Sequence, residues 1–150
     1  MRGVIQRVKK ASVTVDGKLI SEIENGILLF AAIHSDDTDK DFDYIINKTI
    51  NLRIFENDSG LFDKSLIDIS GELLIVSQFT LYGDTRKGRR PSFTRAMNIK
   101  DAKINFSRFI DRFKEKFPNL KTGIFQAMMD VSLINDGPIT VIIDSNKDFY

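Results

Sequence analysis

The chain has no cysteine and no tryptophan, and His34 is its single histidine. The absence of cysteine excludes disulfides, thiolate metal sites and a cysteine nucleophile, and a single histidine excludes zinc sites built on two or three imidazoles. A Ser-His-Asp triad could form only around His34, which follows the apolar run of residues 26–33. Because a histidine at the end of a buried strand is more often structural, we expect no triad, no bound metal and no cofactor.

The chain also lacks a strong net charge and a long hydrophobic run. Its 22 basic and 21 acidic residues leave a net charge of +1, so any contact with a polyanion has to be local. No apolar run approaches the roughly 18 residues that cross a bilayer, and the N-terminus has no signal-peptide core. We therefore expect a cytoplasmic protein without membrane contact. Local positive charge is dense in residues 1–18 and 86–90, where the candidate contacts to nucleic-acid phosphates are Arg7, Arg86, Lys87, Arg89 and Arg90.

What the chain does contain is enough apolar material for one core. Of its 150 residues 42% are hydrophobic, including 12 phenylalanines, which suits a single domain over residues 1–150. No linker, low-complexity tract or repeat interrupts the sequence. Short apolar runs alternate with turn signals and with two helical patterns, and this indicates a mixed α/β fold.

Two segments have helical periodicity. Residues 38–51 place apolar side chains on one face, and residues 99–117 begin after an Asn98 N-cap and end before Pro118. The second helix has a stripe of large apolar side chains that is typical of a core-facing surface, so we assign it no ligand role. Strands are expected at residues 4–8, 11–15, 19–23, 27–33, 52–55, 72–76, 122–125, 131–134 and 139–144.

Polar residues at the end of one apolar strand form the first candidate site. Ser77, Gln78, Phe79 and Thr80 follow residues 72–76 directly. If the strand continues, Gln78 and Thr80 share one face, because side chains alternate across a strand. Such an arrangement can line a pocket, although a Thr80 hydroxyl without a general base is a poor nucleophile.

Gly137-Pro138 forms the second candidate site, in the connection between the last two expected strands. A glycine before proline leaves a backbone that another molecule can approach closely, since no Cβ stands in the way. On spacing alone, an ordinary trans turn is the favoured interpretation.

Several segments of the chain, in this order and spacing, resemble the D-aminoacyl-tRNA deacylase family. The most specific are residues 77–82 (Ser-Gln-Phe-Thr-Leu-Tyr), 84–93 (Asp-Thr-Arg-Lys-Gly-Arg-Arg-Pro-Ser-Phe) and 135–140 (Asn-Asp-Gly-Pro-Ile-Thr). Residues 4–8 and 51–55 are similar to the family as well. The resemblance therefore extends over nearly the whole chain.

The resemblance implies a homodimeric enzyme that hydrolyses the ester joining a D-amino acid, or glycine, to the 3′ end of tRNA. It implies a compact α/β domain with a β-barrel-like mixed sheet and two main helices, related to an editing domain of some archaeal threonyl-tRNA synthetases. It also implies that the Gly137-Pro138 bond is cis and enters the partner's pocket as a chiral filter. The pocket itself would be formed by Ser77, Gln78, Phe79 and Thr80, with Ala127 and Met129 in its wall.

Such an enzyme needs little catalytic equipment of its own. An aminoacyl ester is labile, and the adjacent ribose 2′-hydroxyl of the tRNA can assist its hydrolysis. The backbone N–H groups around Phe79 and Thr80 are our candidates for stabilising the developing negative charge, and the Thr80 hydroxyl could be a nucleophile or position water. Where the family usually has glycine and a small residue this chain has Gln126 and His34, so its side-chain preference can differ.

Two other readings stay open from the residues alone. One is a non-catalytic, dimeric RNA-binding module that uses the basic loop of residues 86–90. The other is a hydrolase of small esters with Thr80 as a covalent nucleophile.

Overall fold

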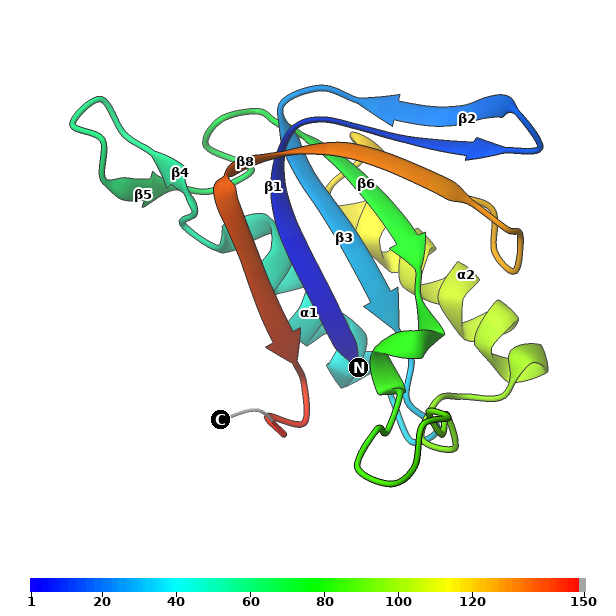
Figure 1. The fold of residues 1–150 in the computed structure, drawn as a ribbon. Coiled ribbons are helices and arrows are strands. Elements are labelled where there is room, and N and C mark those ends of the chain that lie inside the picture. The colour runs from blue at the N-terminus through cyan, green and yellow to red at the C-terminus, as the bar shows by residue number, and fades with distance from the viewer. Residues whose placement is uncertain (149–150) are drawn as a thin grey trace.

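The computed structural model of the chain describes residues 1–148, so the last residues of the expected domain lie outside the described part. Its centre is β1 (Arg2–Val15), a long curved strand. One edge of β1 pairs first with β3 (Gly26–Ala32) and then with β2 (Lys18–Ile23), both antiparallel. The other edge pairs along its length with β8 (Asp130–Asp144). Because β1 has partners on both edges while it bends, the sheet curls toward a barrel (Figure 1).

The sheet continues beyond β3 with parallel pairs. β6 (Glu72–Ser77) runs parallel to β3, and β7 (Leu120–Thr122) runs parallel to β6. The connections contain α1 (Asp39–Asn51) and α2 (Ile99–Lys116), which lie together against one face of the sheet (Figure 1). This mixed α/β fold with two main helices and a nearly closed sheet confirms the expected fold class.

Two hydrophobic clusters hold the layers together. The larger one lies between the helices and the sheet, where Phe109 is fully buried among Phe42, Phe106 and Phe113. The smaller one lies on the opposite face, because Leu28 and Leu74 alternate along their strands with residues of the first cluster. The helical stripe of residues 99–117 therefore faces the core, as its periodicity predicts.

The strands differ from the predicted ones in their continuity. The predicted strands at residues 4–8 and 11–15 form one strand, β1, and those at 131–134 and 139–144 form one strand, β8. β1 and β8 pair with one another on both sides of the predicted breaks. The segment at residues 52–55 is almost entirely non-strand, and it leads into a small hairpin of β4 (Phe55–Glu56) and β5 (Phe62–Lys64) that projects from the body (Figure 1). A strand is predicted at residues 122–125, but residues 123–129 form a loop.

Candidate active site

A cavity of about 550 Å³ lies where the parallel strands β3 and β6 end. Ligand sites of α/β sheets commonly lie at the carboxyl ends of strands. Its walls come from the ends of both strands, the loop after β7 and the start of α2. The lining residues are Ala31, Ala32, Ile33, Val76, Ser77, Gln78, Phe79, Phe93, Ala96, Met97, Asn98, Ile99, Ala102, Phe106, Phe125, Gln126, Ala127, Met128, Met129 and Val131.

Five of the predicted pocket residues meet in this cavity, namely Ser77, Gln78, Phe79, Ala127 and Met129. Thr80 follows them in an exposed position and is not part of the lining. The strand ends at Ser77, so the predicted alternation stops there. The chain then turns into a short 3-10 helix, η1 (Phe79–Tyr82).

The turn into η1 is held by one backbone and one side-chain hydrogen bond. The N–H of Gln78 donates to the carbonyl of Ala31 on β3 (2.8 Å). The Gln78 Nε2 group donates to the Thr80 hydroxyl oxygen (2.5 Å). Gln78 and Thr80 therefore contact each other through the turn, and they do not share the strand face that the sequence predicts.

The first amides of η1 have no helical acceptor, as is general at the start of a helix. Within residues 1–148, the N–H groups of Phe79 and Thr80 have no backbone hydrogen bond to any segment outside η1. The Phe79 ring beside them is 57% exposed and meets the ring of Phe93 edge-on, with centroids 5.2 Å apart. Two amides without a backbone partner thus lie next to an exposed aromatic ring, where Phe79 lines the cavity.

The opposite wall contains residues that the sequence did not indicate. Ala102 and Phe106 belong to the apolar stripe of α2, and Phe106 packs against Phe125 with ring centroids 5.6 Å apart. The stripe therefore has a second role at its N-terminal end, beside its role in the core. The exposed Met128, at 91%, and the half-exposed Phe93 form further parts of the rim.

Gly137 and Pro138 lie away from this cavity, on β8. Between Gln6 and Val8 of β1 the partner position moves from Thr140 to Asn135, so the surplus residues of β8 form a bulge that contains the Gly-Pro pair. The Gly137-Pro138 peptide bond is cis, as the family resemblance implies, and both residues are exposed. The Asn135 side chain closes the bulge, because its Oδ1 accepts from the N–H of Ile139 (2.9 Å).

Arg7 supports this bulge from β1. Its Nε donates to the carbonyl of Asp136 (3.3 Å) and pairs with the Asp136 carboxylate (3.0 Å), while an Nη donates to the carbonyl of Ile54 (2.8 Å). The residue is only 5% exposed. These contacts do not suit the predicted role of Arg7 in binding a phosphate, so we do not retain it among the tRNA contacts.

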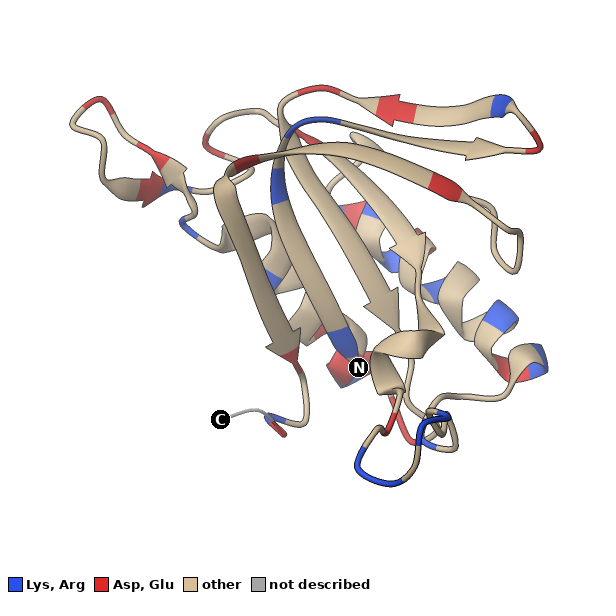
Figure 2. Ribbon diagram, in the orientation of Figure 1, with Lys and Arg blue, Asp and Glu red and all other residues tan. Residues whose placement is uncertain are grey.

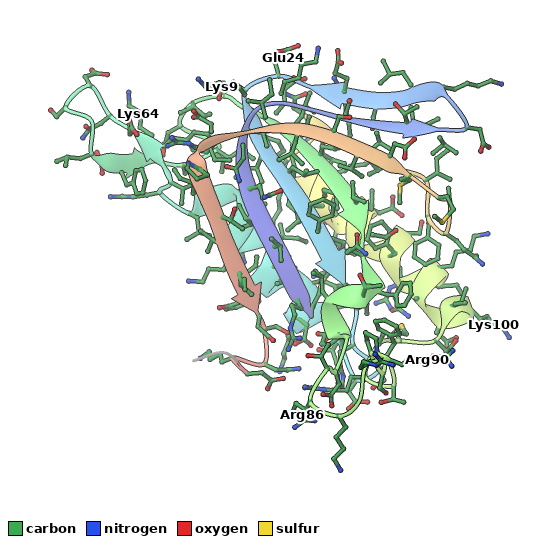
Figure 3. The ribbon with its side chains drawn as sticks, viewed as in Figure 1. Lys9, Glu24, Lys64, Arg86, Arg90 and Lys100 are labelled. Carbon is green, nitrogen blue, oxygen red and sulfur yellow. The ribbon has the colours of Figure 1, made fainter. Side chains whose placement is uncertain are left out.

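The basic loop lies at the end of the molecule where η1 also lies (Figure 2). Arg86 is engaged by Asp84 through several hydrogen bonds, and the Arg86 guanidinium holds the pKa of the Asp84 carboxyl well below its usual range. Lys87, Arg89 and Arg90 are exposed and have no ion pair within residues 1–148. Figure 3 shows Arg86, Arg90 and Lys100 at the opposite end of the molecule from Lys9 and Lys64.

His34 has structural contacts and does not line the cavity. Its Nδ1 accepts from the N–H of Asp36 (3.1 Å), and its ring meets Tyr82 edge-on, with centroids 5.3 Å apart. Among the described residues, no group of three or more His, Cys, Asp or Glu side chains is placed to bind a metal ion. In that same part of the chain, no helix is long and apolar enough to cross a membrane.

Comparisons with known proteins show which family the chain belongs to. Residues 4–144 match the family model described as D-Tyr-tRNA(Tyr) deacylase. A D-aminoacyl-tRNA deacylase of Syntrophus aciditrophicus is 53% identical, and one of Clostridium novyi is 54% identical, each over 99% of this chain and 100% of the relative.

Solved structures give the same result for the fold. A c-Myc DNA unwinding element binding protein superimposes with a TM-score of 0.92 at 40% identity, over 97% of this chain and 99% of its own. A structure described as a probable eukaryotic D-amino acid tRNA deacylase superimposes with a TM-score of 0.82 at 17% identity, over 95% and 98%. Fold and relatives together define a deacylase of aminoacyl-tRNA. The chain belongs to the D-Tyr-tRNA(Tyr) deacylase family, and it is a hydrolase of D-aminoacyl-tRNA.

Proposed function

We propose that the cavity holds the aminoacyl group and the terminal adenosine of the tRNA, and that the 2′-hydroxyl of the adenosine assists hydrolysis of the ester. One observation carries this proposal. Among the described residues that line the cavity, none has a titratable side chain. No side chain of the lining can therefore act as a general acid or base, and this favours assistance by a hydroxyl of the substrate itself.

The protein would then contribute position and charge stabilisation. The free N–H groups of Phe79 and Thr80 would donate to the oxygen on which negative charge develops. The exposed Phe79 and Phe93 rings offer a face on which the terminal adenine can stack. Ser77, Gln78, Ala127 and Met129 complete the walls around the aminoacyl group.

The chiral filter of this proposal comes from a second copy of the chain. Gly137 and Pro138 are exposed and do not line the cavity of their own subunit, so they can act only in the cavity of a partner. The same strand has exposed apolar side chains, with Ile134 at 57% and Ile142 at 47%, which suit contact with a homodimeric partner. Main-chain carbonyls inserted there would exclude an L side chain and admit a D-amino acid or glycine.

Three cations of the basic loop, Lys87, Arg89 and Arg90, would contact the phosphates of the tRNA. Arg86 is held by Asp84 and would help to shape the loop. The substrate implies a location in the cytoplasm, where tRNA is charged.

The decisive test compares three substrates under single-turnover conditions. We expect rapid release of the amino acid from D-aminoacyl-tRNA and from glycyl-tRNA, and little release from L-aminoacyl-tRNA. A D-aminoacyl-tRNA whose terminal adenosine lacks the 2′-hydroxyl should be bound but hydrolysed at least about 100-fold more slowly. Equal rates with and without this hydroxyl would refute the assisted mechanism, and equal rates for D and L substrates would refute the filter.

A further inference from the structure

Arg2, the first residue of β1, joins three separate parts of the fold. Its Nε donates to the carboxylate of Asp144 at the end of β8 (3.0 Å), and an Nη donates to the carbonyl of Leu81 in η1 (2.9 Å). Its guanidinium also lies over the ring of Tyr82, 4.6 Å from the centroid. The residue is 9% exposed and Asp144 is fully buried, so these contacts are shielded from solvent.

We propose that Arg2 is a positioning residue for the active site, which fixes η1 and thereby the amides of Phe79 and Thr80. This inference rests on the function proposed above for those amides. The short η1 helix has few hydrogen bonds of its own, since only Phe79–Tyr82 have 3-10 geometry. A cation that binds a carbonyl at the C-terminal end of a helix stabilises that end through a charge-assisted hydrogen bond.

The surroundings of Tyr82 support this role. The ring is 2% exposed and lies against the His34 ring as well as the Arg2 guanidinium. Within residues 1–148 its hydroxyl is buried without a hydrogen-bond partner. The ring is therefore held by stacking and edge contacts and not by its polar end, so loss of the guanidinium would release both Tyr82 and the adjacent Leu81 carbonyl.

The planar guanidinium is essential to this arrangement. It directs one N–H toward Leu81 while two others face Asp144, and its flat surface covers an aromatic ring. A lysine at this position would keep the charge beside Asp144, but a single ammonium cannot make all these contacts at once. Arg2→Lys should therefore keep much of the ion pair with Asp144 and lose the contacts to Leu81 and Tyr82 that fix η1.

The test compares Arg2→Lys with Arg112→Lys. Arg112 is a matched control, because it also binds a carboxylate, Asp43, but joins the two helices away from the cavity. For Arg2→Lys we expect kcat on D-aminoacyl-tRNA to fall about 10- to 100-fold, as for a displacement of catalytic groups by about 1 Å, with KM within about threefold. For Arg112→Lys we expect kcat to be unchanged. Tm is measured for both, so that loss of folded protein is separated from loss of rate.

A second variant, Tyr82→Leu, keeps the test valid if Arg2→Lys does not fold. It removes the ring beneath the guanidinium, and kcat should again fall while KM stays within about threefold. If the folded variants of Arg2 and Tyr82 keep kcat within twofold of the parent, Arg2 is only a structural residue and the inference is overturned. Failure of the proposed function would give a different result. In that case the parent protein itself would hydrolyse a substrate without the 2′-hydroxyl at the normal rate.

Discussion

Replacement of Thr80 distinguishes a substrate-assisted reaction from covalent catalysis by the protein. The Thr80 hydroxyl is exposed, and its partner within residues 1–148 is the amide Nε2 of Gln78. An amide cannot act as a general base, and no titratable side chain among the described residues lines the cavity beside it. If the hydroxyl only positions water or substrate, Thr80→Ala removes about one hydrogen bond, or about 0.5–1.5 kcal/mol. We therefore expect kcat/KM to fall only about 2- to 12-fold.

The assay measures release of D-amino acid from D-aminoacyl-tRNA in a single turnover, with Thr80→Val as a variant that keeps the shape. Thr14→Ala is a control, since Thr14 does not line the cavity. Removal of a true nucleophile costs a factor on the order of 10⁶. A loss of about 10⁴ or more in Thr80→Ala and Thr80→Val, with an unchanged Tm, would refute the assisted mechanism and favour a threonine nucleophile.

Four further predictions concern the filter, the loop, the core and the response to acid. Gly137 has φ +120° and a Cβ there would come within 2.9 Å of Ile139, so Gly137→Ala should lower the ratio of D- to L-aminoacyl-tRNA hydrolysis; an unchanged ratio in the folded variant would contradict the filter. Arg89→Gln with Arg90→Gln should weaken tRNA binding and reduce the slope of log Kd against log salt by about 1–2, whereas Lys48→Gln on α1 should leave the slope unchanged. Phe109→Ala should destabilise the protein by about 3–5 kcal/mol. A Tm decrease of less than roughly 6 °C would contradict this and indicate that neighbouring core side chains fill the space left by the ring. The pKa of Glu72 is lowered by the N–H of Glu24 and by Lys121, so its contribution to stability is present at neutral pH and is lost as the pH falls through the lowered pKa. Glu72→Gln should therefore destabilise the protein at neutral pH, and this effect should decrease as the pH is lowered below the ordinary pKa of a glutamate, as measured by urea unfolding.

The helices were predictable from sequence because their signals are local. α2 begins and ends within a residue of the prediction, since the Asn98 side chain accepts from the N–H of Asp101 and Pro118 follows the last turn. Strand continuity was not predictable, because it depends on partners far along the chain. The polar residues Lys9 and Lys10 look like a break in β1, yet β8 continues to pair on both sides of them.

The candidate site was predictable only where it has polar chemistry. Ser77 and Gln78 stand out at the end of an apolar run, and the Gly137-Pro138 pair stands out by its backbone. Phe93, Phe106 and Met128 also line the cavity, but an apolar residue has the same signature in a core as in a pocket wall. Arg7 shows the opposite error, because its charge predicts a position at the surface. It is buried because Asp136 and the carbonyl of Ile54, both distant in sequence, satisfy its guanidinium.

A neutral cavity also suits an enzyme that has to distinguish configuration at one carbon atom. A titratable side chain in the wall would favour some amino acid side chains over others, since it would attract or repel their charges. The atoms shared by all aminoacyl esters are the α-amino group, the α-carbon and the ester itself, and main-chain groups are sufficient to contact these. In the proposed site, the amides of Phe79 and Thr80 face the ester and the carbonyls of the partner's bulge face the α-carbon. Selectivity for configuration would then follow from the rigidity of two backbone segments. Contacts that fix these segments, such as the contact of Arg2 to η1, should therefore affect the rate more than the affinity.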